Sequence, residues 1–157
     1  VVVQLYRDYA TKVNNAMLAS GEAPEGEYEG EHNAAGEREG RGVFRFANGN
    51  VYDGEWKAGE AEGRGVFWYA SGDVYDGEYK ADKQEGRGVY RHANGNVDAV
   101  CFKQDAPVGE GVKWAADGQQ AARMRDGNPE EMISQEEARQ TVERLGLPLP
   151  SPLPGTA

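Results

Sequence analysis

A pattern of glycines and aromatic residues repeats every 23 residues through the middle of the chain. The pair Gly40 and Gly42 recurs at positions 63 and 65, 86 and 88, and 109 and 111. The segment Tyr52–Trp56 (YDGEW) returns as Tyr75–Tyr79 (YDGEY), and an earlier copy (YEGEH) begins at Tyr28, one residue out of step. A fixed period of this length is typical of proteins built from stacked, similar units that contact mainly their neighbours. We therefore expect an array of units rather than one domain around a central core.

The alternation within each unit predicts a β-hairpin. In the second unit, Tyr52, Gly54 and Trp56 alternate with acidic residues, which is the two-residue period of a strand. A turn at residues 57–62 leads into a second alternating run, and the cluster ASGD at residues 70–73 turns the chain into the next unit. Each repeat is therefore expected to add two antiparallel strands.

Units at the ends of a repeat array are usually atypical, and both ends of this array depart from the pattern. His32 stands where the second unit has tryptophan, and Asp98 and Val100 stand where the third unit has tyrosine and glycine. Residues 121–125 have the spacing of a first strand and form a terminal half-unit. We expect three clear units, one degenerate unit and this half-unit over residues 28–127.

One strand register places Glu55 opposite Arg64, and it fixes the other pairs of the hairpin. These pairs are Trp56 with Gly63, Gly54 with Gly65, and Tyr52 with Phe67; the neighbouring units give Glu78 with Arg87, Tyr79 with Gly86, Glu31 with Arg41, and His32 with Gly40. Because glycine in mid-strand weakens a sheet unless another group approaches closely, we expect an aromatic ring to lie across each missing side chain. The expected structural glycines are Gly30, Gly42, Gly54, Gly65, Gly77 and Gly88. The exposed charge pairs, at about 0.2–1 kcal/mol each, would set the register more than the stability.

The composition alone gives contradictory signals. Leu, Ile, Val and Phe together number 25 of 157 residues and the net charge is −10, which is typical of disorder. Yet the chain has 8 Tyr and 3 Trp, and rings packed over glycines give a thin sheet the apolar burial that it needs. No run of about 20 apolar residues is present to span a membrane. The acidic balance disfavours binding to nucleic acid, and the single cysteine, Cys101, excludes an internal disulfide.

These residues resemble a known family. Tyr-x-Gly-x-Trp, a short turn, Gly-x-Gly and then Asn/Ser-Gly-x at a 23-residue period is similar to the MORN (membrane occupation and recognition nexus) repeat. The resemblance covers residues 28–127, is specific in the units that begin at Tyr52 and Tyr75, and weakens from Asp98. It implies a mainly β fold: an elongated, twisted, single-layer strip of stacked hairpins with a groove lined by aromatic residues.

Both flanks of the strip are expected to contain a helix. In residues 1–27, apolar side chains at helical spacing predict an amphipathic helix that ends near Gly21. In residues 128–157, Ser134 and Glu137 form a capping box for a helix over Gln135–Leu145, which is followed by an extended Pro-rich tail. We expect the helices to cap the open ends of the strip, with docking onto a partner as the alternative. The tail is held either by the strip or by a partner chain.

Motifs for catalysis, metal binding or cofactor binding are absent from the sequence. The Gly-x-Gly pairs lie inside strands rather than before a helix, so they indicate repeat structure and not a phosphate site. His32 is interpreted as a ring at the groove, His92 as a residue at a strand end, and Cys101 as a structural residue. The carboxylates are interpreted as a solvated ladder along one face. We therefore expect no enzyme activity, no cofactor and no metal.

The leading hypothesis for function is a non-catalytic scaffold or accessory subunit that binds a protein partner in the aromatic groove. The candidate groove residues are Tyr28, His32, Tyr52, Trp56, Tyr75, Tyr79 and Phe102. The alternative is a purely structural role, in which these rings only pack on one another. The resemblance implies two further alternatives, a module for phosphoinositides or anionic membranes, and a regulatory segment of a larger enzyme such as a phosphatidylinositol phosphate kinase.

The expected partners and compartment follow from the same resemblance and from the charge. The family implies a multi-subunit assembly, often cytoskeletal or flagellar, or a complex associated with an organelle. Residues 28–127 have more acids than bases, which disfavours anionic lipid. We expect an intracellular, reducing compartment, either cytoplasmic and cytoskeletal or an organelle reached after removal of a transit peptide.

Overall fold

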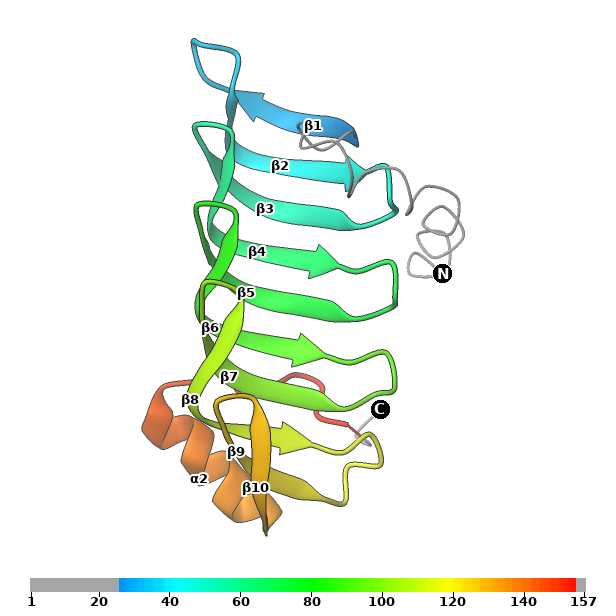
Figure 1. The fold of residues 1–157 in the computed structure, drawn as a ribbon, viewed down its shortest axis with the longest axis vertical. Helices are drawn as coiled ribbons and strands as arrows, with labels where there is room; N and C mark the ends of the chain where they lie inside the picture. Colours follow the sequence, from blue (N-terminus) through cyan, green and yellow to red (C-terminus); the bar gives the residue numbers. More distant parts are fainter. Residues whose placement is uncertain (1–25, 155–157) are drawn as a thin grey trace.

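A single antiparallel sheet of ten strands makes up most of the computed structural model, which describes residues 26–154. Strand order in the sheet follows chain order, so each hairpin lies beside the next in a long single-layer strip (Figure 1). The strands are β1 (Gly26–His32), β2 (Arg38–Phe46), β3 (Val51–Lys57), β4 (Glu60–Trp68), β5 (Val74–Lys80), β6 (Lys83–Arg91), β7 (Val97–Lys103), β8 (Ala106–Trp114), β9 (Ala121–Arg125) and β10 (Asn128–Ile133). The predicted fold class is confirmed. The helix expected within residues 1–27 lies outside the described residues.

Two kinds of turn alternate along the strip. Inside the hairpins from β3–β4 onward, a two-residue turn has positive φ at both positions, for example Ala58 (48°) and Gly59 (85°), whereas the β1–β2 turn is longer and spans residues 33–37. Such turns match the natural twist of paired strands. Between units the turn is longer, as at Tyr69–Asp73, where the amide of Tyr69 donates to the carbonyl of Asp73 at 2.9 Å. The first kind of turn is shorter than the predicted one over residues 57–62, and this shifts the pairing around it.

The predicted register is correct at one end of the hairpin and wrong at the other. Tyr52 faces Phe67 and Gly54 faces Gly65, as expected. Beyond this point the register shifts, and Trp56 faces Ala61 instead of Gly63. Between units, Arg41 faces Glu55 and Arg64 faces Glu78. The predicted ion pair of Glu78 with Arg87 still forms within its hairpin, at 3.6 Å between Oε2 and Nε, because the shifted strand keeps the two side chains close. The other predicted pairs fail in the same way, since Tyr79 faces Gln84, His32 faces Arg38, and Gly40 and Gly86 face Trp56 and Phe102.

A bulge explains this shift and gives the first glycine of each Gly-x-Gly pair its role. The two-residue turn leaves extra residues in β4, and Gly63 absorbs them in a left-handed conformation with φ of 81°. The Glu55 carboxylate then accepts a hydrogen bond from the backbone amide of Arg64. Glu78 and Arg87 repeat this contact in the next unit. The first glycine of the pair therefore permits the bulge, whereas the second one permits a ring contact that is described below.

Hydrogen bonds from side chains to backbone tie each unit to the next. Glu39, Glu62 and Glu85 each accept the amide of the first turn residue one unit later, at 2.9, 3.1 and 2.8 Å. Asn50, Asp73 and Asn96 do the same for the longer turns, accepting the amides of Ala70, Ala93 and Ala116. Many of the acids that the sequence suggested were only solvated are thus part of the connection between units.

The helix α2 (Gln135–Leu145) agrees with its predicted bounds, including the capping box and a left-handed Gly146 at its C-terminus. Ala138 and Val142 are buried with Trp114 of β8 and Ala121 of β9. The helix therefore covers one face of the last strands (Figure 1). Among the described strands, none pairs with the outer edge of β10. This differs from the expected cap on the sheet edge. Strand β10 itself was not predicted, and it carries the sheet to Ile133, past the expected limit at Gly127.

The Pro-rich tail is held by the strip itself as far as residue 154. Leu147 is buried beside α2, and Leu153 packs against the same cluster. Two arginines of β6 reach the tail: Arg87 donates to the carbonyl of Gly146 at 3.3 Å, and Arg91 donates to that of Pro152 at 3.0 Å. The tail therefore returns along the same face that α2 covers.

Candidate binding groove

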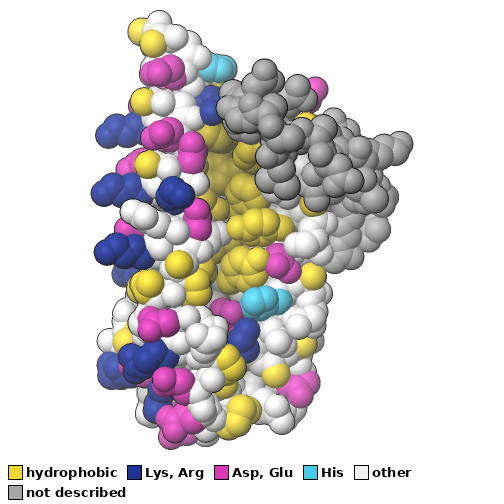
Figure 2. All heavy atoms as spheres, in the orientation of Figure 1, with side chains coloured by type: hydrophobic (Ala, Val, Ile, Leu, Met, Phe, Trp, Pro, Cys, Tyr) yellow, Lys and Arg dark blue, Asp and Glu magenta, His cyan; other side chains and the backbone are white. Residues whose placement is uncertain are grey.

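Aromatic rings from successive units gather on one face of the sheet, which we call the ring face. It carries Tyr52, Gly54 and Trp56 and their repeat equivalents, and α2 lies on the opposite face. Figure 2 shows a band of hydrophobic side chains along this face, bordered on one side by rows of charged side chains.

In the first three units a tyrosine lies across two glycines. A Cβ at Gly65 would lie 2.4 Å from carbon Cε2 of the Tyr52 ring, and Gly54 faces the same ring. The Tyr52 hydroxyl donates to the carbonyl of Glu55 at 2.9 Å, which fixes the ring along its strand. Equivalent contacts join Tyr28 with Gly30 and Gly42, and Tyr75 with Gly77 and Gly88. The expected ring over a glycine is therefore present, but it is Tyr52 over Gly65 and not Trp56 over Gly63.

These tyrosines and their neighbours form a continuous edge-to-face stack. The centroid of the Tyr52 ring lies 5.0 Å from those of Trp56 and Tyr79, at interplanar angles of 88° and 78°. The stack extends through Tyr28–Trp56, Tyr75–Tyr79 and Tyr75–Phe102, at 5.5, 5.4 and 5.0 Å. Edge-to-face geometry of this kind is favourable beyond the area that it buries. The rings therefore connect the units into one rigid array.

Most of the candidate groove residues form the floor of the groove rather than its exposed surface. Tyr52, Trp56, Tyr75, Tyr79 and Phe102 are only 0–7% exposed, and burial raises the pKa of the Tyr52, Tyr75 and Tyr79 hydroxyls. Tyr28 is partly buried, and His32 is exposed with its ring 5.0 Å from that of Tyr28. The structure thus brings the seven predicted residues onto one face, with five of them largely buried in its floor.

A second row of rings, which the sequence analysis missed, lies beside this floor and is partly exposed. We call Phe46, Phe67, Tyr69 and Tyr90 the outer row. Their ring centroids follow one another at 5.7, 4.6 and 5.9 Å, and burial raises the pKa of Tyr69 to about 12. The signal for them is the alternation of the second strand, which places Phe67 and Tyr69 on the same face as Gly65. These rings are the accessible part of the ring face.

Arg38, at the start of β2, occupies the groove in the first unit. Its guanidinium carbon lies 4.7 Å from the centroid of the Trp56 ring and 5.0 Å from that of Phe44. Its Nη2 and Nε donate to the carbonyl of Gly59 at 2.6 and 3.2 Å. One unit further on, a cavity of about 310 Å³ opens beside Ala61. We call this cavity the Ala61 pocket; its walls include Tyr52, Phe67, Tyr79 and Asp82, and Arg38 borders it on the side of the first unit.

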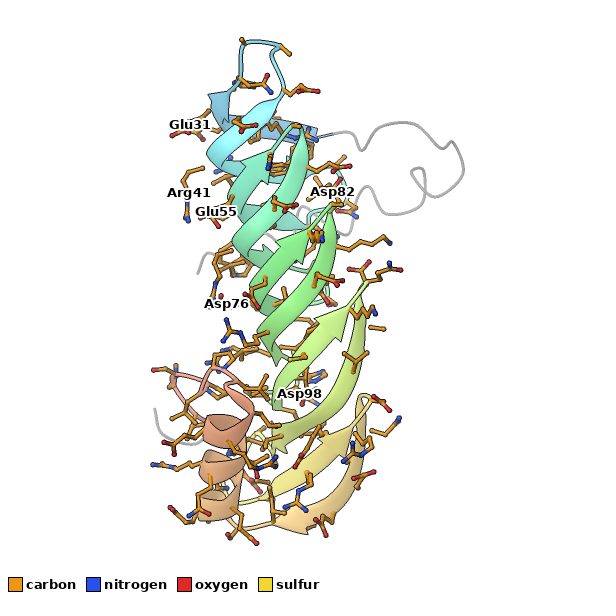
Figure 3. The ribbon with its side chains drawn as sticks, turned by 90° about the vertical axis from the view of Figure 1, so that its left-hand side faces the viewer. Glu31, Arg41, Glu55, Asp76, Asp82 and Asp98 are labelled. Carbon is orange, nitrogen blue, oxygen red and sulfur yellow. The ribbon has the colours of Figure 1, made fainter. Side chains whose placement is uncertain are left out.

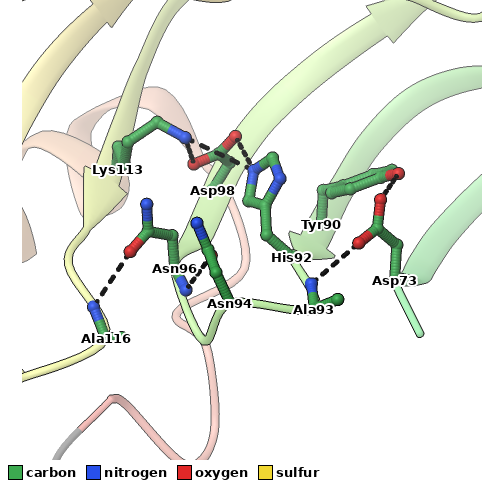
Figure 4. A network of polar contacts seen from close by, with 9 residues as sticks. All are labelled: Asp73, Tyr90, His92, Ala93, Asn94, Asn96, Asp98, Lys113 and Ala116. Carbon is green, nitrogen blue, oxygen red and sulfur yellow. Dashed lines mark hydrogen bonds and ion pairs between the residues drawn. The ribbon is translucent and has the colours of Figure 1, made fainter. Parts of the chain in front are cut away.

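The ring stack ends in the fourth unit at a polar cluster. Asp98, which replaces the tyrosine, lies 2.7 Å from Nζ of Lys113 and 2.7 Å from Nε2 of His92 (Figure 4). Val100 fills the space over the next strand, since a Cβ at Gly111 would lie 2.5 Å from its Cγ1. The two departures therefore belong together, because removal of the ring leaves room for the valine. A second cavity of about 400 Å³ adjoins His92 and Lys113.

The opposite face carries charge pairs and the C-terminal segment. Arg41 lies 3.8 Å from Asp53 and Arg64 lies 3.4 Å from Asp76, in exposed pairs that contribute little stability. Figure 3 shows Glu31, Arg41, Glu55 and Asp76 on this side of the sheet and Asp82 on the other. Cys101 also lies on this face, where burial raises the pKa of its thiol. No helix within residues 26–154 is long and apolar enough to cross a membrane.

Comparison with known proteins gives one result. The family model of the MORN repeat matches four consecutive segments, residues 34–51, 52–74, 75–97 and 101–120, which together make up more than half of the chain. The second and third segments each begin at the tyrosine that starts a ring stack. A search of curated proteins finds no match to this chain.

Proposed function

Since the chain belongs to the MORN-repeat family, whose repeat is a non-catalytic module, we propose that it is a scaffold or accessory subunit that binds a protein segment along the ring face. The observation that carries this proposal is the outer row, four partly exposed rings in line above a buried aromatic floor. Aromatic side chains on a preformed surface are typical of the residues that dominate protein interfaces.

The rigidity of the strip supports this proposal. The buried ring stack and the hydrogen bonds between units hold the outer row in place before any partner arrives. Binding to a preformed surface avoids most of the cost of ordering side chains. An extended segment or an amphipathic helix laid along the strip would contact several units at once.

The charge distribution favours a protein partner over an anionic membrane. The chain has 27 acidic and 17 basic residues. On the face opposite the rings, Arg41 and Arg64 pair with aspartates, and Arg87 and Arg91 contact backbone carbonyls of the C-terminal segment. Bases that are already engaged in this way contribute less to attraction by anionic lipid, which depends on juxtaposed Lys and Arg.

The proposal is tested by affinity purification of the tagged full chain from its source, followed by quantitative mass spectrometry. The test variant carries Phe46→Ser and Phe67→Ser, in two rings of the outer row. The control is Trp68→Ala, which changes the neighbouring residue of β4 on the opposite face. Thermal unfolding first establishes that both variants are folded.

We expect partners of the wild-type chain to be lost by the outer-row variant and retained by Trp68→Ala. Retention of every partner by the outer-row variant would contradict the proposal. Co-sedimentation with vesicles with and without anionic lipid provides a second readout. Strong, salt-sensitive binding to the anionic vesicles alone would favour a membrane module instead.

A further inference from the structure

The Ala61 pocket lies at a repeat position where alanine replaces the larger side chain of the other units. Counting in steps of 23 residues from Arg38, the equivalent positions are Ala61, Gln84 and Pro107. Arg38 fills its position with a guanidinium, and Gln84 fills its own with an amide that donates to the Tyr69 hydroxyl at 2.8 Å. Between them, alanine leaves a cavity of about 310 Å³.

The surroundings of Arg38 recur around Ala61 residue by residue. The guanidinium carbon of Arg38 lies 6.0, 5.0 and 4.7 Å from the ring centroids of Tyr28, Phe44 and Trp56, and its nitrogens donate to Gly59. The repeat equivalents of these four residues are Tyr52, Phe67, Tyr79 and Asp82. All four line the Ala61 pocket. The pocket is therefore a second copy of a guanidinium site from which the guanidinium is absent.

Two differences make the second copy a receptor for a cation from outside. Asp82 supplies a carboxylate where Gly59 has none, and one of its oxygens accepts the amide of Ala61 at 2.7 Å. No base within residues 26–154 forms an ion pair with this carboxylate. The Tyr79 side chain is 6% exposed, and among the described residues its hydroxyl makes no well-formed hydrogen bond, although the Gln84 side chain lies close to it. Buried hydroxyls without a partner are uncommon, so a donor or acceptor from a ligand is expected there.

We propose that the Ala61 pocket binds the guanidinium of an arginine side chain from the protein partner. This inference rests on the proposed function and names the chemistry that the groove selects. Arginine stacks on aromatic faces and pairs with a carboxylate at the same time, which matches the rings and Asp82. Arg38 also lines this pocket, so its guanidinium lies beside the incoming one. Its charge is engaged by the carbonyl of Gly59 and by the faces of the Phe44 and Trp56 rings, and the Asp82 carboxylate opposes the remaining repulsion.

The pocket also sets the position of the partner along the groove. The first unit is occupied by Arg38, the third by Gln84, and the fourth has Pro107 at this position. The cavity beside Pro107 already holds the side chains of Lys113 and His92 on Asp98, so an arginine from outside fits best in the second unit. A single such contact fixes the register of a segment whose remaining contacts are with the outer row.

The test uses the full chain labelled for nuclear magnetic resonance and Nα-acetyl-arginine methylamide as the probe. The matched control probe is the citrulline analogue, which keeps the shape of the side chain and removes its charge. We expect saturable shifts of the amides of Ala61, Tyr79 and Asp82 with a dissociation constant on the order of millimolar, and citrulline binding at least about tenfold weaker. Equal binding of the two probes, or shifts elsewhere only, would overturn the proposal.

Two variants make the test specific. Asp82→Asn keeps an oxygen to accept the Ala61 amide and removes the charge, so the arginine probe should bind at least about fivefold more weakly. Ala61→Arg fills the pocket from within, as Arg38 does, and should abolish binding. Ala35→Arg, which adds the same charge at an exposed turn, should bind the probe as the wild type does. If Ala61→Arg does not fold, Asp82→Asn decides: unchanged binding would overturn the proposal.

The same variants separate this inference from the proposed function. In affinity purification, loss of the partners by Asp82→Asn as well as by the outer-row variant supports both. Partners that are lost by the outer-row variant but kept by Asp82→Asn and Ala61→Arg would overturn the arginine pocket and leave the groove standing. Partners kept by all variants would contradict both.

Discussion

The Tyr52 ring lies so close to Gly65 that a Cβ added to the glycine would be 2.4 Å from ring carbon Cε2. This pair, repeated as Tyr28 with Gly42 and Tyr75 with Gly88, explains how a chain with few aliphatic residues folds. The glycine lets the ring lie flat on the strand, and the ring covers backbone that the glycine would otherwise expose. A single-layer strip therefore needs rings over glycines rather than a thick aliphatic core.

The Gly65→Val substitution should destabilise the protein much more than Gly72→Ala. Valine at position 65 occupies the space of the Tyr52 ring, which then loses its burial and its hydrogen bond to Glu55, at a cost of about 3 kcal/mol or more. Alanine at position 72 has to adopt a positive φ of 99°, a strain of about 1–2 kcal/mol. The measurement is urea unfolding of both variants. Similar losses would show that the ring contact is not what Gly65 is needed for.

The Trp114→Ala substitution should release α2 from the sheet. Trp114 is fully buried under the helix, and its indole nitrogen donates to Gln135 at 3.1 Å, so the expected loss is about 3–5 kcal/mol. Trp68 has the same repeat position on the same face but is only half-buried, which makes Trp68→Ala the matched control with a clearly smaller loss. Hydrogen exchange should show faster exchange within Gln135–Leu145 in the first variant only. Unchanged protection of the helix would contradict its packing on Trp114.

Stability should fall at alkaline pH because buried tyrosines resist ionisation. Burial raises the pKa of Tyr69 from its ordinary value of 10.0 to about 12. Its contribution to stability is therefore complete below about pH 10 and is lost as the pH rises through about 12. Tyr69→Phe should cost about 1 kcal/mol at neutral pH, through the lost hydrogen bond with Gln84. The difference between the two proteins in urea unfolding should narrow above about pH 10, and a constant difference would contradict the shifted pKa.

Local signals in the sequence were sufficient to predict most of the architecture. The 23-residue period fixed the hairpins, and Ser134, Glu137 and Gly146 fixed both ends of α2, because capping depends only on neighbouring residues. The predicted strand register was wrong where the pairing depends on the geometry of the turn. A two-residue turn with Ala58 at positive φ was not evident, and the bulge at Gly63 then moved every pair beyond Gly54.

The groove was predicted less well than the fold, for reasons of burial. The first-strand rings, such as Tyr52 and Trp56, have the clearest motif, and that motif exists because they are buried in the stack. The accessible rings of the outer row lie in the second strands, where the repeat is weaker. Strand β10 was missed because Pro129 and two acids interrupt its pattern. The sequence alone does not reveal the Ala61 pocket, because the pocket is recognised only when the surroundings of Arg38 are seen to recur in space around Ala61.

The most direct test of the central claim, that the ring face binds protein, is site-specific photo-crosslinking in the source cell. A photoreactive phenylalanine analogue replaces either Phe67 or Trp68, two adjacent, half-buried residues of β4 that lie on opposite faces of the sheet. The account predicts a discrete protein adduct from position 67 and none from position 68. Adducts of equal yield from both positions, or an adduct from position 68 alone, would contradict it.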